Sequence, residues 1–584
     1  MATTYDKASL VMIPSGVKED KLYSIKPTSG DGDFTFSRGS DIEATRVNSS
    51  GLIEKAKVNL FRYSNVFDNV NWNKINTSVT GGHTGFDGSS DAWLLTKTDA
   101  NGNIYQSQSY SGVMTLSFYA KANTSDWVRL RNGGGYAYFD VANGVVGGTI
   151  SDIDSTITSV GTDGWYRIEV AYNGSIGISQ LFVADSDGFT SGTSGSVYIQ
   201  FPQLEYGLIA KDYVDAPTAS VVEGLTADLP RLDYSGGASC PNLLLEPSRS
   251  NLFQQSEYLI SGSGWSAANL DRTANAVVSP EGVQNATEIA ATGSGGHPIY
   301  EDIAIANGTY TISMFVKKGA NTAKSDLSDG YSSTSASFDL DAGTINENTP
   351  ETLNAFIEPY SDDWYRIGYT FVVTASQSQP ALYLYDSSGN QSYTANGETM
   401  YIFGLQLELG SYGTSYIPTY GTAAGRGVDE CVATSVSDLI GQTEGTLFYE
   451  FDIQNLSGQD NDPITITAKD SGGTDNIYIQ TRADGGVRGI YYAGGGVQGF
   501  TNSGSGYLSD GNHKIAFGYK ENDFVLYIDG VQVDTDTSGA TSGSFDELYL
   551  GYYNNSFNPS INSKQTLLFK TRLTNAELAS LTQF

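Results

Sequence analysis

Short stretches in which apolar and polar residues alternate run along much of the chain. In residues 115–120 every second side chain belongs to an apolar set, and residues 312–316 repeat the pattern. Residues 165–170 and 364–369 form a second matching pair. A period of two is typical of a β-strand that turns one face to a core. The chain is therefore predicted to contain many short strands.

These strands belong to a long internal repeat. The second copy keeps the order of the first, and the spacing between copies widens along the chain, which indicates that only loops have lengthened. The repeat is much longer than a solenoid unit of roughly 20–50 residues, so it is a duplicated domain, long enough for a jelly-roll sandwich. Five segments recur: 59–61 with 251–253, 117–121 with 313–317, 139–140 with 338–339, 165–168 with 364–367, and 203–205 with 406–408.

The C-terminal part predicts a third sandwich. Alternation recurs in residues 447–453 and 515–519. The pair Asp529-Gly530 stands between two alternating runs, and both central residues of a type I′ turn need positive φ, so the pair predicts a hairpin. Thr574 and Glu577 fit a capping box that opens a short helix ending near residue 582.

The expected architecture is all-β and multidomain, because alternating runs and turn residues dominate and helix-forming runs are scarce. The expected division is 1–58 as a separate N-terminal segment, 59–218 as the first jelly roll, 219–250 as a connector, 251–425 as the second jelly roll, and 440–584 as the third sandwich.

Composition limits the classes of function. With 39% hydrophobic residues, the 584-residue chain can form several cores. The formal net charge of −33 argues against partners that are themselves anionic, because no basic stripe can release phosphate counterions. We therefore expect no nucleic-acid binding and no membrane insertion. No window reaches the roughly 18 apolar residues of a membrane span.

Residues 1–7 lack a basic region followed by an apolar stretch, so no signal peptide is expected. Cys240 and Cys431 lie far apart in the sequence, and we interpret both as free thiols. These features predict synthesis in a reducing cytoplasm.

Several motifs accompany the repeated strands: Asn-Leu-Phe followed by Ser, Trp-Tyr-Arg, Phe-Asp with a downstream Gly, Gln-Leu-Glu, and residues 416–419, Tyr-Ile-Pro-Thr. In this combination the repeat resembles the carbohydrate-binding-module-like jelly rolls of phage tail-fibre and other virion proteins. The first copy departs from the pattern at Pro217, where the Ile-Pro-Thr ending is blurred.

Residues 34–38, 44–48 and 51–54 resemble the N-terminal element of the same group, and so do residues 230–234 and 240–247. In that group the two elements lie close together in the sequence. We therefore interpret the first jelly roll as an inserted duplicate that splits an N-terminal domain. This interpretation requires residues 20–55 to touch residues 225–250.

The C-terminal unit is similar to the concanavalin A-like/laminin-G fold through residues 510–516, 526–530 and 573–578. The predicted fold class is thus all-β, with two duplicated jelly rolls followed by a concanavalin A-like sandwich. The motifs occupy core and turn positions, so they indicate fold more specifically than function.

The resemblance implies a phage virion structural protein, a head or tail fibre that projects from the particle and binds host surface polysaccharide. Residues 1–58 would attach it to other virion proteins, and it would be a homotrimer located in the virion after synthesis in the host cytoplasm. The alternatives are a capsid decoration or structural fibre without glycan specificity, and a polysaccharide depolymerase.

Catalytic motifs are scarce. His83, His297 and His513 fall in different predicted domains, and we interpret the first two as solvated loop residues and the third as a sheet-edge residue. A glycosidase needs only two carboxylates about 5–10 Å apart, yet no acidic pair is singled out by its spacing. We expect a binding protein rather than an enzyme, with no catalytic residue and no organic cofactor.

Two acidic pairs offer clustered oxygen ligands of the kind that calcium prefers: Asp460 with Asp462, and Asp534 with Asp536. Neither pair fits the twelve-residue EF-hand loop. Solvated loop acids are the preferred interpretation of both, and a calcium site is the alternative.

Sugar binding would use exposed aromatic rings, which stack on the apolar faces of sugars beside polar side chains that orient the hydroxyls. Consecutive aromatics in a strand point to opposite faces, so one residue of each adjacent pair is expected in the core. The candidates are Tyr491, Tyr492, Phe500, Tyr552 and Tyr553.

Overall fold

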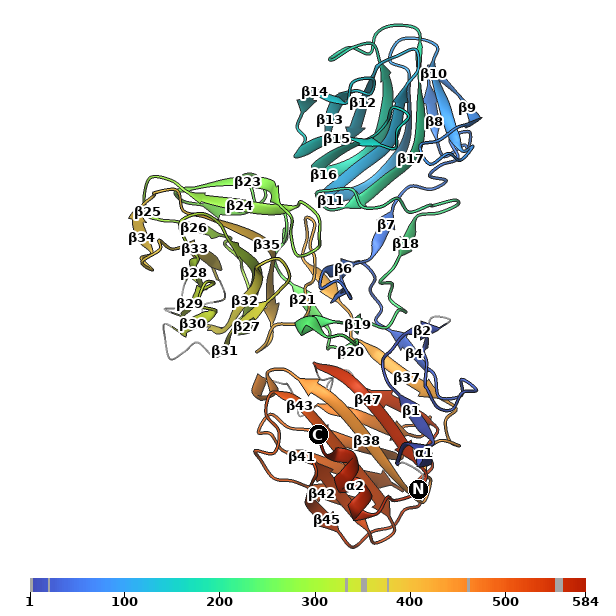
Figure 1. Cartoon of the computed structure of the whole chain (residues 1–584), viewed down its shortest axis with the longest axis vertical. Helices are drawn as coiled ribbons and strands as arrows, with labels where there is room; N and C mark the ends of the chain where they lie inside the picture. Colours follow the sequence, from blue (N-terminus) through green and yellow to red (C-terminus); the bar gives the residue numbers. More distant parts are fainter. Residues whose placement is uncertain are drawn as a thin grey trace.

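The structure is a computed structural model that describes residues 4–18, 21–330, 334–347, 354–374, 376, 378–458, 463–551 and 560–584. Figure 1 shows three lobes that meet at a common junction, with both termini in the lower lobe. The protein is all-β and multidomain, as predicted. Within the described residues the α-helices are α1 (Thr4–Lys7) and α2 (Asn575–Thr582), and short 3₁₀ turns are η1 (Ser235–Gly237) and η2 (Leu456–Gly458).

The first lobe is a jelly roll whose two layers share two long strands. β11 (Asn103–Ala122) pairs with β16 (Trp165–Ala184) along nearly its whole length. Buried side chains such as Phe118 and Ile168 fill the space between the layers. The strand order is β14 (Val145–Ile150), β13 (Gly135–Asp140), β12 (Trp127–Asn132), β16, β11, β17 (Gly195–Tyr206), β10 (Ala92–Lys97) and β9 (Thr77–His83), with β8 (Asn73–Ile75) on β11 and β15 (Asp154–Val160) on β16.

The second lobe repeats this pairing order with separate strands, so the duplication seen in the sequence is also present in the topology. Its core contains Phe253, Ile312 and Ile367. One sheet has the order β22 (Ser266–Ala267), β26 (Pro298–Tyr300), β33 (Ala381–Leu384), β28 (Lys324–Ser328), β29 (Ser335–Asp339), β30 (Thr344–Glu347). The other has β23 (Leu270–Val277), β24 (Ala286–Ala291), β35 (Thr399–Leu409), β27 (Gly308–Lys318), β32 (Trp364–Val373), β31 (Asn354–Pro359), and β25 (Ser294–Gly296) pairs with β34 (Ser392–Thr394).

The third lobe is a sandwich of two large sheets around a core that includes Phe36, Phe451 and Phe517. One sheet has the order β19 (Leu232–Asp233), β20 (Asn242–Leu245), β47 (Ile561–Phe569), β38 (Glu444–Ile453), β43 (Gly511–Lys520), β44 (Phe524–Ile528), β45 (Val531–Asp536), with β1 (Leu10–Met12) on β47. The other has β2 (Val17–Lys18), β3 (Lys21–Leu22), β4 (Phe34–Ser37), β37 (Glu430–Thr434), β46 (Glu547–Leu550), β39 (Ile464–Lys469), β40 (Asn476–Thr481), β41 (Val487–Ala493), β42 (Gly496–Asn502).

The expectation of a separate N-terminal segment was wrong. β1 and β4 belong to the two sheets of the third lobe, where Leu10 pairs with Leu568 and Phe36 pairs with Cys431. The connector strands β19 and β20 complete the same lobe, so the third sandwich extends well beyond residues 440–584. Strands of two to four residues cannot be stable alone, and these reach a core only by pairing with distant segments.

The two parts of the proposed split domain do touch. The amide of Val47 donates to Asp233 Oδ1 at 2.7 Å, and the amide of Tyr234 donates to Val47 O at 2.9 Å. The chain enters and leaves the first jelly roll through one antiparallel pair, β7 (Lys57–Asn59) and β18 (Val221–Glu223) (Figure 1). The remaining pairs at the junction are β5 (Thr45–Val47) with β6 (Ile53–Lys55), and β21 (Arg249–Asn251) with β36 (Ala424–Arg426).

Local predictions at the C-terminus are confirmed. Asp529 and Gly530 join β44 to β45 with φ of 48° and 84°. Helix α2 begins after a complete capping box, in which Thr574 accepts from the amide of Glu577 while the Glu577 side chain accepts from the amide of Thr574. Both cysteines are free, Cys240 exposed and Cys431 buried, as expected.

Candidate functional site

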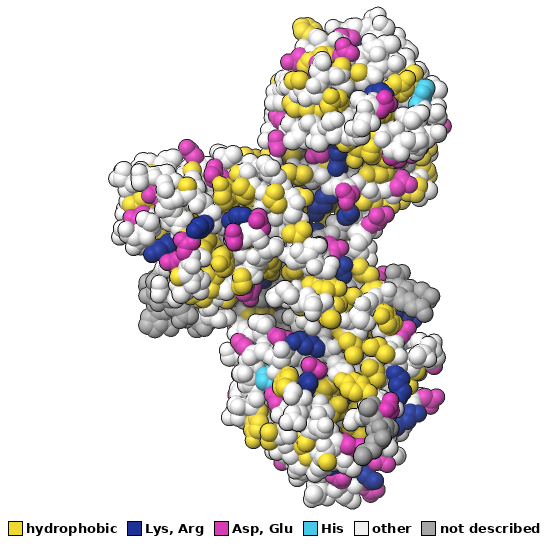
Figure 2. Space-filling view, in the orientation of Figure 1, with side chains coloured by type: hydrophobic (Ala, Val, Ile, Leu, Met, Phe, Trp, Pro, Cys, Tyr) yellow, Lys and Arg dark blue, Asp and Glu magenta, His cyan; other side chains and the backbone are white. Residues whose placement is uncertain are grey.

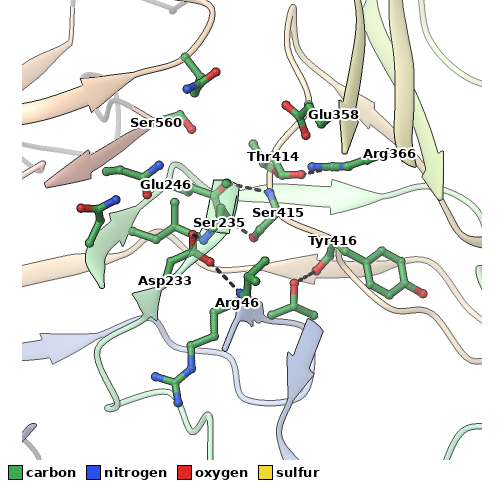
Figure 3. A pocket seen from close by; sticks show the side chains of 18 of the residues that line it. Arg46, Asp233, Ser235, Glu246, Glu358, Arg366, Thr414, Ser415, Tyr416 and Ser560 are labelled. Atoms are coloured by element: carbon green, nitrogen blue, oxygen red, sulfur yellow. Dashed lines mark hydrogen bonds between the residues drawn. The ribbon is translucent and has the colours of Figure 1, made fainter. Parts of the chain in front are cut away.

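A cavity of about 460 Å³ lies where the second jelly roll meets the third lobe and the junction strands. Its lining comes from segments that are far apart in the sequence: β5, residues 233–246, residues 358–366, residues 413–416, the end of β38, and the start of β47. Figure 3 shows labelled side chains from these segments gathered around one space. No one of the three lobes could form this cavity alone.

Buried hydrogen bonds hold one wall of the cavity in place. The two carboxylate oxygens of Asp233 accept from the amides of Val47 and Ser235 at 2.7 and 3.0 Å. Thr45 Oγ1 donates to the carbonyl of Tyr416 at 2.7 Å (Figure 3). These contacts connect β5, the connector and the end of the second jelly roll, so the wall is rigidly positioned.

A buried ionic network lies behind this wall. Arg231 Nη1 is 2.7 Å from Glu246 Oε2, and Arg426 Nη1 is 3.0 Å from the same oxygen. Arg231 also pairs with Asp429, whose other oxygen is 3.8 Å from Arg38 Nη1. All five side chains are at most 3% exposed, so each depends on its partners rather than on water for charge compensation.

Glu246 connects the network to the cavity. The amide and hydroxyl of Ser415 donate to its two carboxylate oxygens at 2.7 and 2.6 Å. Burial by itself would raise the pKa of Glu246, but Arg426, Arg231 and Ser415 together lower the pKa to about 2. The carboxylate is therefore ionised at any ordinary pH and cannot serve as a proton donor.

Arg366, from the repeated Trp-Tyr-Arg motif, holds the part of the lining that comes from the second jelly roll. Its Nη2 donates to Ser313 Oγ at 3.0 Å. It also donates to the carbonyl of Thr414 at 2.5 Å (Figure 3). Its guanidinium carbon lies 5.8 Å from the ring centroid of Phe315 and 5.9 Å from that of Phe356. Arg366 thus fixes the 413–416 loop against the second jelly roll.

Further polar residues of the lining come mostly from the third lobe and the connector. It includes Asn562 and Lys564 on β47, Gln454 after β38, and Asn242 on β20. Oδ1 of Asn562 is buried and accepts no hydrogen bond from the described residues. Tyr360 adds a half-buried aromatic ring. Amide, ammonium and aromatic groups in this combination suit a polyhydroxylated ligand with polar edges and apolar faces.

The carboxylates of the cavity do not form a ready hydrolytic pair. Asp233 and Glu246 are fully engaged with backbone, hydroxyl or arginine donors. Asp452 accepts from Gln454 Nε2 at 2.8 Å. Among the described lining residues this leaves Glu358, which is exposed and makes no described hydrogen bond. Glycoside hydrolysis needs two cooperating carboxylates.

The described aromatic candidates lie on β41 and β42, at the edge of the other sheet of the third lobe and away from this cavity. Tyr491 is fully buried against Tyr519, Phe524 and Phe545, so its expected role in sugar binding was wrong. Its neighbour on β41, Tyr492, is half-buried on the opposite face, in agreement with the expectation that one of the pair is core. Phe500 on β42 is 41% exposed, and Tyr552 and Tyr553 lie outside the described residues.

Two of the acidic candidates, Asp534 and Asp536, have structural partners. Asp534 Oδ2 accepts from the amide of Asn502 at 2.7 Å, and Asp536 Oδ2 accepts from the amide of Phe500 at 3.1 Å. Both acids lie on β45 rather than in a loop and connect it to β42. The described residues contain no cluster of three or more His, Cys, Asp or Glu that could hold a metal, and Asp460 and Asp462 lie outside them.

The histidines are separate from one another and from the cavity. His297 is fully buried between the carbonyls of Asn269 and Tyr393, so the expectation of a solvated loop residue was wrong for it. His83 is half-buried at the end of β9. His513 Nδ1 is 2.7 Å from Asp529 Oδ2 at the hairpin turn.

The sequence did not single out the cavity residues as functional. Several of them stand inside the motifs that marked the fold: Arg46, Asp233, Glu246, Arg366 and Tyr416. Five separate motifs meet at this one cavity, so membership in these motifs was the signal that the sequence offered. Nothing in the sequence pattern distinguished Glu358 or Asn562.

No known protein-family profile matches the sequence, and no curated protein matches it. Among solved structures, the CBM40 domain of the Ruminococcus gnavus IT-sialidase is 15% identical over 26% of this chain and 86% of that chain, with a TM-score of 0.22. Domain 4 of AbnA, a GH43 extracellular arabinanase from Geobacillus stearothermophilus solved with arabinotriose, is 15% identical over 27% and 73%, with a TM-score of 0.20.

The binding domain of Botulinum neurotoxin DC, solved with rat synaptotagmin II, is 12% identical over 26% of this chain and 40% of that chain, with a TM-score of 0.22. At these values the similarities establish neither a family nor a function for this chain. Within the described residues, no helix combines the length and apolar character needed to cross a membrane.

Proposed function

We propose that the chain is a non-catalytic glycan-binding protein of a phage virion, a head or tail fibre that contacts host surface polysaccharide. The observation that carries the binding role is the junction cavity. Its size, its amide and ammonium groups and its aromatic ring suit one or two sugar residues. Its single uncommitted carboxylate among the described lining residues favours binding over hydrolysis.

The arrangement of the lobes supports a projecting role. Three sandwiches extend in different directions from one junction (Figure 1), and the junction is held by buried charges and hydrogen bonds rather than by a flexible linker. Strands β1 to β4 are paired inside the third lobe. We therefore place the attachment to other virion proteins on that lobe rather than on a free N-terminal arm, within a homotrimer.

A glycan array probed with the full-length protein tests the binding role. Ala238 lines the cavity and has extended backbone geometry, so Ala238→Trp fills the cavity without backbone strain. Ala540→Trp adds the same ring to an exposed loop of the third lobe and is the matched control. We expect neutral or mixed glycans to bind wild type and the control, and to lose at least about tenfold in affinity for Ala238→Trp.

Two further measurements separate the alternatives. Release of reducing ends from host polysaccharide would identify a depolymerase and contradict the non-catalytic role. Firm incorporation into particles together with an array free of hits would favour a structural or decoration protein. Reconstruction of the virion would locate the three-lobed density on the head or the tail and report its copy number.

A further inference from the structure

One face of the first jelly roll carries an unusual set of arginine and aromatic side chains. On β12, Val128 and Leu130 enter the core, while Trp127, Arg129 and Arg131 point to the other face. The strand register places Arg129 between Tyr138 of β13 and Phe182 of β16, and places Arg131 between Tyr136 and Gln180. We call this set the arginine–aromatic face: Trp127, Arg129, Arg131, Tyr136, Tyr138 and Phe182.

Arg129 lies close to three aromatic rings. Its guanidinium carbon is 3.7 Å from the ring centroid of Phe182, 5.2 Å from that of Tyr136 and 5.8 Å from that of Tyr138. The two tyrosine rings meet edge to face, with centroids 6.0 Å apart and an interplanar angle of 81°. Stacking of this kind removes rotamer freedom from the arginine. Nη1 of Arg129 donates to Tyr138 Oη at 3.4 Å, which leaves Nη2 to bind a planar acceptor.

The two arginines are not neutralised within the chain. Among the described residues neither Arg129 nor Arg131 has a carboxylate within 4.0 Å, and Nε of Arg129 is buried without a hydrogen-bond partner. Asp140, on the neighbouring strand β13, accepts from the amides of Ala142 and Asn143 and from Asn143 Nδ2. In a chain with a net charge of −33, two adjacent unpaired arginines form a local cationic site.

The second jelly roll shows that the fold itself does not require this face. Asp140 and Asp339 close the same hairpin in the two copies, so the register makes Asp326 the counterpart of Arg129 and Ser337 the counterpart of Tyr138. Asp326 is 2% exposed and accepts from Ser337 Oγ at 2.9 Å. The duplicated position is therefore cationic and aromatic in one copy and acidic in the other.

We propose that the arginine–aromatic face binds a carboxylated sugar, either a uronic acid or a sialic acid, within an acidic polysaccharide. The sugar carboxylate pairs with Arg129 and Arg131, and the apolar face of the sugar ring packs on Tyr136. The site is separate from the junction cavity and does not depend on it. Charge complementarity selects acidic over neutral glycans, and the second jelly roll has Asp326 where this site has Arg129.

Binding of tri-galacturonate and of oligosialic acid to the full-length protein, measured by titration calorimetry, tests the proposal. The uncharged probes are the methyl esters of the same oligosaccharides. We expect at least one acid to bind and its ester to bind at least about tenfold more weakly, with affinity that falls as salt is raised. Binding of the ester and the acid with equal affinity, or of neither acid, would overturn the proposal.

Variants locate the site. Arg129→Gln and Tyr136→Ala should each lower the affinity for the acidic oligosaccharide by about tenfold or more. Lys318→Gln, which removes an exposed cation from the second jelly roll, should leave the affinity unchanged. Ala238→Trp should also leave it unchanged, which separates this site from the junction cavity. Thermal melting of each variant checks folding. If a folded Arg129→Gln variant binds the acidic oligosaccharide with the affinity of wild type, the assignment is refuted.

Discussion

Arg231 and Glu246 meet inside the junction, with Nη1 of the arginine 2.7 Å from Oε2 of the glutamate and both side chains at most 3% exposed. Both residues belong to the connector, and the carboxylate is shared with Arg426, which follows the second jelly roll. The buried carboxylate of Glu246 thus joins the connector to the segment that follows the second jelly roll, and both segments continue into the third lobe. The shape of the cavity depends on this contact, because Glu246 also holds Ser415 in its wall.

Replacing the carboxylate by an amide should destabilise the junction. Glu246→Gln leaves Arg231 and Arg426 buried beside a neutral group, and removal of one partner from a buried pair costs about 3–5 kcal/mol. We expect a loss of this size in the free energy of unfolding of the third lobe, measured by urea denaturation. Asp341→Asn is the control, because its pair with Lys318 is more than half exposed on both sides and contributes little to stability. Equal effects of the two variants would contradict the role of the network.

Acid should weaken the same junction. The pKa of Glu246 is about 2 in the folded protein, below its usual range of about 4.3 in an unfolded chain. The stability that comes from this depression is present above the unfolded value and is lost as the pH falls toward 2. We expect wild type to lose more unfolding free energy than Glu246→Gln between about pH 5 and pH 2.5. Parallel curves for the two proteins would argue against this ionised pair.

Glu205 should make the free energy of unfolding depend on pH in the opposite direction. Burial raises its pKa to about 7, although Gln203 and the amide of Lys211 partly favour the ionised form. A carboxyl with a raised pKa binds its proton more tightly in the folded state, so stability is present at low pH and falls as the pH rises from about 4.5 to above 7. Glu205→Gln should remove most of this loss, which is of the order of 3 kcal/mol. Unfolding curves at about pH 5 and pH 8 measure it, and an unchanged difference between the two pH values would count against the assignment.

The duplicated asparagines should be equivalent and independent. Nδ2 of Asn59 donates to the carbonyls of Pro202 and Val214, and Nδ2 of Asn251 donates to the carbonyls of Leu405 and Ile417 in the other jelly roll. All four distances lie between 2.8 and 3.1 Å. An alanine at either position leaves two buried carbonyls unpaired and should cost about 2–4 kcal/mol.

Because the two cores are separate, the effects of Asn59→Ala and Asn251→Ala should be confined to their own lobes and should add in the double variant. Proteolysis followed by mass spectrometry can report the opening of each lobe. Cooperative loss of both lobes in either single variant would show that the jelly rolls do not behave as separate folding units.

Local signals in the sequence were sufficient for elements whose partners are nearby. The Asp529-Gly530 hairpin and the capping box at Thr574 depend on a few adjacent residues, and both are present. The repeated motifs identified the two jelly rolls because buried positions such as Asn59 and Asn251 make the same contacts in each copy.

The pairing of strands that are far apart in the sequence could not be predicted in the same way. Strand β1 is three residues long and pairs with Leu568 and its neighbours at the far end of the chain, and no local period indicates that partner. Burial of His297 and the cavity itself also depend on how distant segments pack. The order of motifs in the sequence indicated which residues matter for the fold, but not that five of them surround one space.

A crystal structure of the full-length protein soaked with the best neutral or mixed glycan from the array tests the central claim most directly. We expect an intact sugar in the junction cavity, hydrogen-bonded to Asn562 or Lys564 and in contact with the ring of Tyr360. A glycan bound elsewhere on the molecule while the cavity remains empty would contradict the claim, and so would a cleaved glycan in the cavity.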